Sequence, residues 1–199
     1  MSNPTTTTNN STDYLTIQNT TSTTPIYLTK YFITDIPASV NIHTNEAVYS
    51  KLMFVPHPYT TADAESWITS QLLPVPIPAI LPYQVIRANH PDQNGLFIGG
   101  ASLCLKEDGS GEHELGYYLH PDWRGKGIMR AAVRELVEWA TKEQGAKAIV
   151  RVAEGNLESR RVIEGMPEWE RVESRDGDVD VPEVKGGGKR HVLFWKWTG

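Results

Sequence analysis

Short runs of apolar and β-branched residues predict β-strands from residue 26 onwards. The runs are separated by proline, Asn-Gly or Asp-Gly-Ser-Gly sequences, which favour turns. The predicted strands are residues 26–36, 84–88, 96–105, 112–119, 146–152, 169–173 and 191–197. Short turns join the second, third and fourth runs, so we expect an antiparallel meander there.

The spacing of apolar residues becomes helical after Pro121. The apolar stripe is formed by Ile128, Met129, Ala132, Val133, Leu136 and Val137. This pattern is typical of a long, half-buried helix, and Gly145 is placed to end it. The helix connects the strands at 112–119 and 146–152, and a crossover of this kind brings two strands together in parallel. The centre of the chain is therefore predicted to be a β-α-β unit.

Three further helices are expected. One covers residues 38–52, another has Thr61 or Asp63 as its N-cap, and a short one begins near Asn156. Four prolines within residues 72–82 predict an extended connection rather than a strand inside the sheet.

Polar segments bound the predicted domain. Residues 1–24 are rich in Thr, Asn and Ser and bury too little apolar area to offset their ordering entropy, so we interpret them as a flexible tail. Within this tail, 14–17 is a short apolar patch that would add a strand if the sheet offers an edge. Residues 174–190 contain three consecutive glycines and are predicted to be a mobile loop. The remaining chain, 25–199, is expected to form one domain.

Composition narrows the classes of function. The chain has 199 residues, of which 39% are hydrophobic and 22% charged, as in an ordinary globular domain. A net charge of -5 provides no general attraction for nucleic acid, and no apolar stretch is long enough to cross a bilayer. Cys104 is the only cysteine, which excludes an intramolecular disulfide and fits the cytoplasm. The six histidines show no metal-ligand spacing, so no metal is expected.

The candidate chemistry lies where a strand enters a glycine-containing turn that opens the long helix. Gly125 and Gly127 allow the backbone to approach an anion closely, and the free N–H groups of a helix start favour negative charge. Arg124, Lys126 and Arg130 add positive side chains, which suits a ligand with more than one phosphate. Tight strand-to-helix turns use glycine without any ligand about as often, so the turn alone leaves both interpretations open.

Four landmarks together resemble one family. The turn Arg124-Gly125-Lys126-Gly127-Ile128-Met129 is similar to the acetyl-CoA loop of the GNAT (Gcn5-related N-acetyltransferase) superfamily. The other three landmarks resemble its ribosomal-protein alanine acetyltransferase (RimJ/RimL-like) type: they are Val55-Pro56-His57-Pro58-Tyr59 before a Trp-Ile helix, Glu114-Leu115-Gly116-Tyr117, and Asn156-Leu157-Glu158-Ser159. The resemblance implies an α/β (α+β) GNAT fold: a mixed, mostly antiparallel sheet of six to seven strands, a central β-α-β acetyl-CoA unit and flanking helices.

The resemblance also implies how acetyl-CoA would be held. In this family the strands before and after the central helix splay apart, and the pantetheine arm fills the gap. Main-chain N–H groups from Arg124 through Gly125, Lys126, Gly127 and Ile128 to Met129 would bind the pyrophosphate. The backbone near Leu119 would polarise the thioester carbonyl. One departure from the family pattern is Met129, where Gly or Ala is preferred and a long side chain must turn away from the pyrophosphate.

Three side chains receive candidate roles, Asn156 and Ser159 from the same resemblance and Glu114 from its place on the strand beside the expected gap. Asn156 would contact pantetheine, or simply cap the following helix, and both roles are compatible. Ser159 would protonate the departing thiolate as a general acid, or be an ordinary residue of the first helical turn. Glu114 is the candidate general base, acting directly or through water; as an alternative it is an exposed carboxylate on a strand. Tyr117 and Tyr118 point to opposite faces of that strand, so we expect only one of them to border the acceptor site.

The leading functional hypothesis is an acetyl-CoA-dependent N-acetyltransferase in which an amine attacks the thioester directly in a ternary complex. The acceptor would be a protein N-terminus or a small amine. A non-catalytic acyl-CoA-binding or regulatory module is the alternative, and a protein-interaction module is a third hypothesis. The sequence does not identify the amine, and a homodimer stays open.

Overall fold

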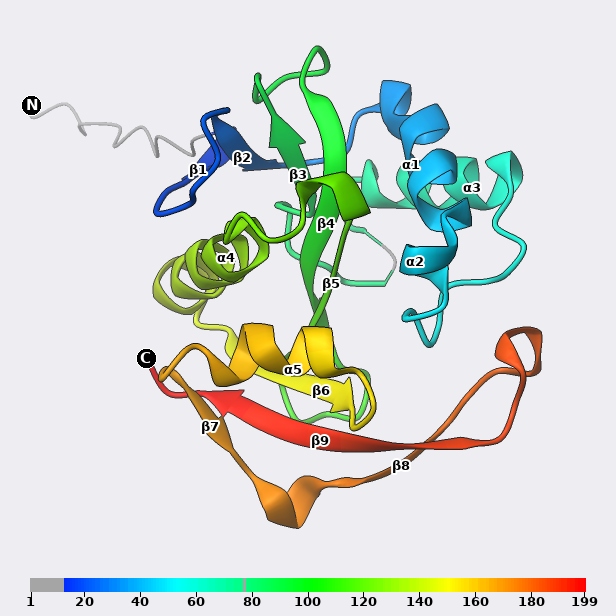
Figure 1. Cartoon of the computed structure of the whole chain (residues 1–199), viewed down its shortest axis with the longest axis vertical. Coiled ribbons are helices and arrows are strands. Elements are labelled where there is room, and N and C mark those ends of the chain that lie inside the picture. The colour runs from blue at the N-terminus through cyan, green and yellow to red at the C-terminus, as the bar shows by residue number, and fades with distance from the viewer. Residues whose placement is uncertain (1–12, 77) are drawn as a thin grey trace, which may run out of the picture.

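The computed structural model describes residues 13–76 and 78–199, which form one mixed sheet flanked by helices (Figure 1). The strands of these residues are β1 (Tyr14–Ile17), β2 (Ile26–Thr29), β3 (Val85–Ala88), β4 (Leu96–Leu105), β5 (Glu112–Leu119), β6 (Lys147–Ala153), β7 (Trp169–Arg171), β8 (Gly177–Asp180) and β9 (Lys189–Trp197). Their order in the sheet is β1-β2-β3-β4-β5-β6-β9-β7, with β8 also paired to β9. Only β5 and β6 pair in parallel, so the sheet is mixed and mostly antiparallel, as predicted.

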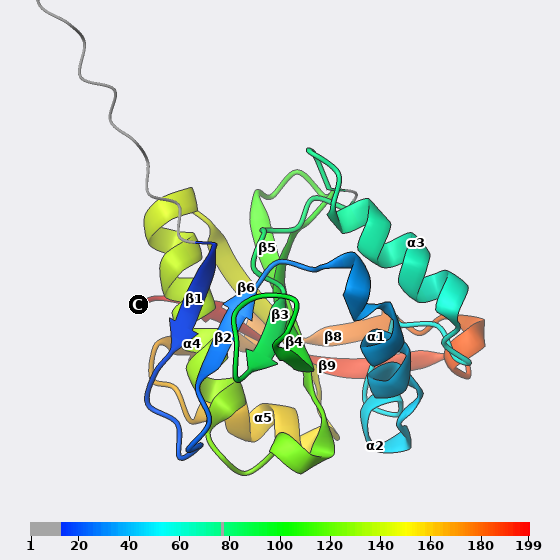
Figure 2. The ribbon, with the colours of Figure 1, turned by 90° about the horizontal axis from the view of Figure 1, so that it is seen from above.

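The helices cover both faces of the sheet (Figure 2). They are α1 (Ile36–Thr44), α2 (Glu46–Tyr49), α3 (Thr61–Gln71), α4 (Ile128–Gln144) and α5 (Leu157–Glu164). One hydrophobic core lies between the sheet and α4, and α5 adds Ile163 to it. A second, smaller core packs Ile42 of α1 and Ile68 of α3 against the opposite face. The sheet is thus packed against helices on both of its faces.

Helix α4 matches the predicted amphipathic stripe. All six residues of that stripe are buried, and the helix ends at Gly145, whose φ of +64° places it in the left-handed region. Its position between β5 and β6 builds the predicted β-α-β unit. Across the described ranges, no helix is long and apolar enough to span a membrane.

The sheet has more strands than the predicted six to seven, because the described residues form nine. The apolar patch at 14–17 does form a strand, β1, which pairs with β2 at the sheet edge. Residues 14–17 are therefore part of the sheet, and residues 1–12 of the predicted tail lie outside the described residues. Part of the predicted mobile loop, Gly177–Asp180, is β8, which pairs with an extended β9. Its alternately half-exposed and exposed residues give no hydrophobic periodicity, so the sequence pattern does not reveal it.

The boundaries of two elements predicted between residues 26 and 52 also differ from those in the structure. Strand β2 ends at Thr29 instead of residue 36, because Asp35 accepts a hydrogen bond from the N–H of Phe32 and starts a helical turn. The helix predicted at 38–52 is divided at Asn45, whose side chain caps α2 by accepting from the N–H of Ala47.

The predictions for helix α3 and for the connection after it agree better with the structure than those for β2 and α1. The N-cap of α3 is Thr60, and Asp63 completes the capping box as the third residue of the helix. Between α3 and β3, the described residues form only one isolated bridge, Ile80 with Cys104, in agreement with the predicted extended connection.

Candidate active site

The parallel strands β5 and β6 separate part of the way along their length. Their pairing ends at Glu114 and Ile149. Beyond this point β5 continues beside β4 to Leu119, whereas β6 continues beside β9 to Ala153. A gap therefore opens between them, which confirms the splay expected from the resemblance.

The backbone of Leu119 points into this gap. The next residue, His120, donates its N–H to the carbonyl of Ile98 on the β4 side at 2.8 Å. Since successive residues of a strand direct their N–H groups to opposite edges, the N–H of Leu119 points away from β4. Its carbonyl accepts a hydrogen bond from Nε of Arg124 at 3.2 Å. A main-chain donor thus faces the opening at the end of β5.

The glycine turn follows directly. Gly125 and Gly127 have φ values of +75° and +72°, in the left-handed region that favours glycine. Gly127 is also the N-cap of α4, and the first N–H groups of a helix have no acceptor within it. Gly127 and Ile128 line a cavity of about 590 Å³. This turn has the backbone geometry of an anion site.

Met129 does not obstruct the turn by its length. Its side chain is buried and packs in the core beneath α4, although the residue still borders the cavity. The departure from the family pattern is accommodated because the thioether fills core volume.

The cations around the turn are anchored to main-chain carbonyls. Arg124 also donates from Nη2 to the carbonyl of Ala47 at 2.9 Å, linking the turn to α2. Lys126 donates to the carbonyl of Asp122, and Arg130 to that of Arg161. None of these carbonyl contacts neutralises a charge. Arg124 also pairs with Glu158, whose Oε2 lies 3.6 Å from its Nη1, whereas Lys126 and Arg130 form no ion pair with the described residues.

A larger cavity of about 630 Å³ lies beside the first, and the two share walls. Their common lining residues are Lys51, Leu52, Tyr117, Tyr118, Asn156 and Ser159. Both tyrosines therefore border the larger cavity, and the expectation that only one would do so is wrong. Their side chains do lie on opposite faces of β5, but the gap beside β5 opens to both faces.

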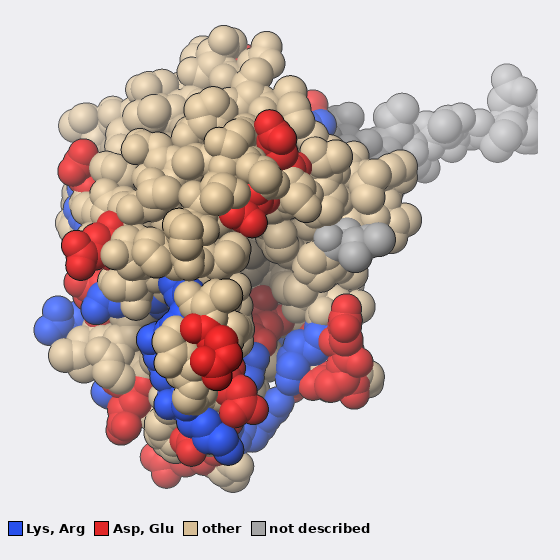
Figure 3. All heavy atoms as spheres, turned by 90° about the vertical axis from the view of Figure 1, so that its right-hand side faces the viewer, with Lys and Arg blue, Asp and Glu red and all other residues tan. Residues whose placement is uncertain are grey.

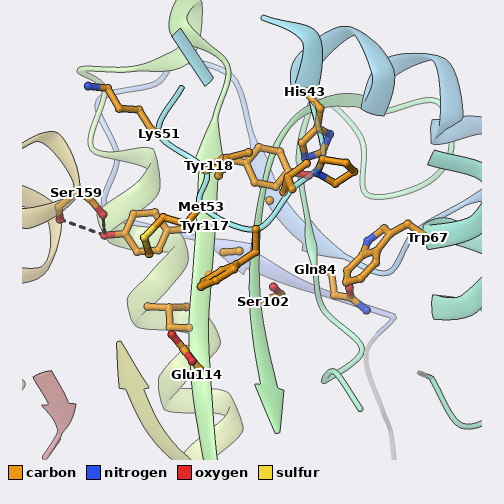
Figure 4. A pocket seen from close by; sticks show the side chains of 18 of the residues that line it. His43, Lys51, Met53, Trp67, Gln84, Ser102, Glu114, Tyr117, Tyr118 and Ser159 are labelled. Carbon is orange, nitrogen blue, oxygen red and sulfur yellow. Dashed lines mark hydrogen bonds between the residues drawn. The ribbon is translucent and has the colours of Figure 1, made fainter. Parts of the chain in front are cut away.

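Helix α5 presents Ser159 at this junction. Oδ1 of Asn156 accepts from the N–H of Ser159 at 3.2 Å, so Asn156 is the N-cap of α5 and its amide NH₂ stays available. The hydroxyl oxygens of Ser159 and Tyr117 are 2.5 Å apart, and Tyr117 also donates to the carbonyl of Ser159 at 3.0 Å (Figure 4). Burial raises the pKa of Tyr117 well above its usual value, which keeps this phenol protonated.

Glu114 lies in the larger cavity in a bidentate ion pair. Arg151 of β6 donates from Nε and Nη2 to its two carboxylate oxygens at 2.8 and 2.7 Å. The hydrogen bond to Glu114 raises the pKa of Arg151 above its usual value. Each carboxylate oxygen already accepts one charge-assisted hydrogen bond, so a base at this position would use the remaining lone pairs.

Aromatic side chains close the far side of the larger cavity. The ring of His43 lies 4.6 Å from those of both Tyr59 and Tyr118, and Nδ1 of His43 donates to the carbonyl of Ser39 at 2.9 Å. Burial lowers the pKa of His43, so its imidazole is neutral near pH 7. Trp67 of α3 completes this wall (Figure 4).

The sequence analysis did not single out Arg151 or His43, and it named Trp67 only as part of the Trp-Ile helix landmark. A signal for Arg151 exists: it is the one charged side chain in the apolar run 148–153, and a cation in a buried strand needs a partner. No comparable signal marks His43, which reaches the cavity through packing between elements distant in sequence.

The chain is similar in sequence to known proteins. The acetyltransferase (GNAT) domain family matches residues 26–166. The Bacillus subtilis protein named "Putative ribosomal N-acetyltransferase YdaF" is 33% identical over 101 residues, which are 46% of this chain and about half (55%) of that protein.

Solved structures share the fold at low sequence identity. Mycobacterium smegmatis RimJ in complex with CoA-disulfide superposes with a TM-score of 0.69 at 16% identity, covering 94% of this chain and 87% of that one. A spermidine N-acetyltransferase from Vibrio cholerae, in complex with CoA and spermine, gives 0.65 at 15% identity, covering 86% and 94%. These likenesses show the shared fold, and the family match over residues 26–166 shows the family: the chain belongs to the GNAT acetyltransferase family.

Proposed function

We propose that this protein is an acetyl-CoA-dependent N-acetyltransferase that works by direct attack of an amine in a ternary complex. The observation that carries the proposal is the opening between β5 and β6 beyond Glu114. It joins a glycine turn suited to phosphate with a second cavity, and Ser159 stands at the junction. One substrate in each cavity would bring thioester and amine together at that residue.

The smaller cavity would hold acetyl-CoA. The N–H groups from Arg124 to Met129 would bind the pyrophosphate, and the free amide NH₂ of Asn156 would donate to the pantetheine arm in the gap. The N–H of Leu119 would donate to the thioester carbonyl, which becomes more negative as the tetrahedral intermediate forms. Apart from that of Asn156, these roles need main-chain groups, which the gap and the turn leave exposed.

The chemical step would be an addition followed by elimination. The lone pair of the neutral amine forms a bond to the thioester carbon, the carbonyl re-forms, and the carbon–sulfur bond breaks. Ser159 would give a proton to the departing thiolate and regain one from water, while the hydroxyl of Tyr117, in contact with that of Ser159, would hold it in place. The proton lost by the amine nitrogen would pass to Glu114 or to a water beside it.

How much help the base must give depends on the acceptor. A peptide N-terminus with a pKa near 8 is about 10% neutral at pH 7, whereas a lysine-like amine is neutral below about 0.1%. Glu114 remains the proposed base, working through the lone pairs that Arg151 leaves free. A protein N-terminus fits this moderate demand.

The proposal is tested by two measurements on one preparation. Calorimetry should show acetyl-CoA binding, and a thiol-release assay with a panel of amines and N-terminal peptides should show turnover. Initial rates varied in both substrates should give intersecting lines, and mass spectrometry should find no acetyl-enzyme. Binding without turnover of any acceptor would instead identify a non-catalytic acyl-CoA-binding module and overturn the proposal.

A further inference from the structure

One ring nitrogen on the wall of the larger cavity has no partner among the described residues. His43 of α1 is only 5% exposed, and its ring lines the cavity. Nδ1 lies 2.9 Å from the carbonyl oxygen of Ser39, which can only accept, so Nδ1 carries the proton of the ring. Because burial lowers the pKa of His43, the imidazole is neutral and Nε2 keeps its lone pair. No described residue donates a hydrogen bond to this lone pair.

The contacts of the ring fix the direction of Nε2. Ser39 lies one turn before His43 on α1, so Nδ1 points back at the helix and Nε2 points away from it. The side chain extends from α1 towards Tyr118 (Figure 4), and the rings of Tyr59 and Tyr118 both lie 4.6 Å from the imidazole. An acceptor held among aromatic rings costs free energy until a donor pairs with it. Nε2 is therefore a hydrogen-bond acceptor for a molecule in the cavity.

Asp63 adds a second acceptor near this wall. It lies in the first turn of α3 and lines the same cavity. Thr60 donates twice to its Oδ2, and no described cation forms an ion pair with it. Burial chiefly raises the pKa of Tyr59, and the nearby negative charge of Asp63 adds to the rise. On the face that carries α1 and α3, basic side chains lie mainly at the lower end, around the β8–β9 hairpin (Figure 3). This side of the cavity thus favours a substrate group that donates hydrogen bonds.

His43 also lies close to the reacting end of β5. Tyr118, against which its ring packs, immediately precedes Leu119, whose N–H is proposed to hold the thioester carbonyl. The attacking nitrogen must lie at that carbonyl. A group a few bonds further along the same molecule would therefore be the one that reaches Nε2.

We propose that Nε2 of His43 accepts a hydrogen bond from the acceptor substrate, and so selects amines that carry a second donor, an N–H or O–H group, a few bonds from the attacking nitrogen. This inference rests on the acetyl transfer proposed above. A peptide N-terminus offers this chemistry through the amide N–H after its first residue, and a small amino alcohol offers it through its hydroxyl. A substrate without the donor leaves Nε2 unpaired among the aromatic rings, which lowers kcat/KM.

Matched acceptors that differ in one donor test the substrate side. Alanine N-methylamide and alanine methyl ester have nearly the same shape, but the ester has an oxygen atom in place of the amide N–H. Ethanolamine and 2-methoxyethylamine are the corresponding pair of small amines. In the thiol-release assay we expect kcat/KM to be about tenfold higher for the donor in one of these pairs, and that pair identifies the source of the acceptor. Equal kcat/KM values within both pairs would overturn the inference.

Variants of His43 test the residue itself. Glutamine places its amide near the position of Nε2 and keeps an acceptor there, whereas asparagine places its amide near Nδ1 and keeps only the contact with Ser39. H43N should lower kcat/KM for the preferred acceptor about tenfold and abolish the preference within its pair, while H43Q should retain most of both.

The control variant is H57N. His57 also stacks on a tyrosine, with its ring 3.9 Å from that of Tyr49, but it lines neither of the two cavities. H57N should behave as the wild-type protein. Calorimetry should give an unchanged affinity for acetyl-CoA in H43N, H43Q and H57N, since His43 does not line the smaller cavity.

The preference within a pair separates recognition from stability. A merely structural His43 would lower the rates of both members equally, so a preference that survives in H43N would overturn the inference. If H43N does not fold, H43F is the second test, because phenylalanine keeps a ring against Tyr59 and Tyr118 but has no acceptor; a preference that survives there is equally contradictory. Failure of the proposed function looks different, because no amine would then release thiol from any of these proteins.

Discussion

The hydroxyl groups of Tyr117 and Ser159 lie 2.5 Å apart, although 42 residues separate them in the chain. Strand β5 supplies one and helix α5 the other, and the pair stands where the two cavities meet. If Ser159 protonates the leaving thiolate, S159A should lower kcat about 100-fold with little change in the KM for acetyl-CoA. Steady-state kinetics with a fixed acceptor measure this effect.

Tyr117 has a positioning role in this pair, and Y117F tests it. The variant removes the hydrogen bond but keeps the ring, so kcat should fall about tenfold while the KM for acetyl-CoA stays within about twofold. In the double variant with S159A the second change should add almost nothing, because both act on the same proton transfer. Additive losses would show that the two hydroxyls act separately.

The phosphate turn can be tested with two glycines of similar backbone conformation. Gly127 has a φ of +72° at the start of α4, and Gly145 has a φ of +64° at its end. G127A and G145A should each cost about 1 kcal/mol in the free energy of unfolding, because alanine is strained there. Only G127A should weaken acetyl-CoA binding, by about tenfold, since its turn borders the cavity.

Calorimetry and urea unfolding on the same preparations separate these two effects. Equal losses of acetyl-CoA affinity in G127A and G145A would mean that the effect is general destabilisation. In that case the turn at Gly127 would have no special part in binding.

Much of the fold could be predicted because its signals are local. The stripe of α4, the turns of the β3–β5 meander and the crossover to β6 each arise from residues close in sequence, and the structure has all three. Strand β8 was missed because its residues Gly177–Asp180 are mostly polar and its pairing depends on β9.

Only the backbone features of the candidate site could be predicted from the sequence. The glycine turn follows from motif positions, and the gap beyond Glu114 was expected from the family resemblance, whereas neither gives the partners of individual side chains. The contact of Glu114 with Arg151, for example, joins residues 37 positions apart. No local pattern specifies such pairs, because they depend on how separate elements pack together.

The buried His43 should make the free energy of unfolding decrease as the pH falls below 6.5. Burial holds its pKa in the folded protein below the usual value of 6.5, and the groups packed against it are the uncharged Tyr59, Tyr118 and Ser39. Below pH 6.5 the unfolded chain therefore binds a proton that the folded protein does not. Stability should fall as pH drops from 6.5 towards the folded-state pKa, by at most about 1.4 kcal/mol per pH unit from this residue.

The variant H43Q should remove the contribution of His43 to the slope of the free energy of unfolding against pH. Urea unfolding at several pH values between 5 and 7.5 measures this slope. His113, whose pKa is also lowered by burial, adds to the slope and should remain effective in H43Q. The exposed His90 supplies the control variant H90Q. A slope in H43Q equal to that of the wild-type protein would contradict the assignment.

The segment before β2 should support both the sheet and the phosphate turn. Strand β1 buries Ile17 at the sheet edge, and the N–H of Thr21 donates to the carbonyl of Lys126 at 3.0 Å. Removing residues 1–24 should lower the free energy of unfolding by at least about 1.5 kcal/mol, the contribution of one buried isoleucine. It should also weaken acetyl-CoA binding several-fold, because Lys126 loses a contact that fixes the turn. Removing only residues 1–12 is the matched control, and equal acetyl-CoA affinity in the two shortened proteins would show that the turn holds its shape without Thr21.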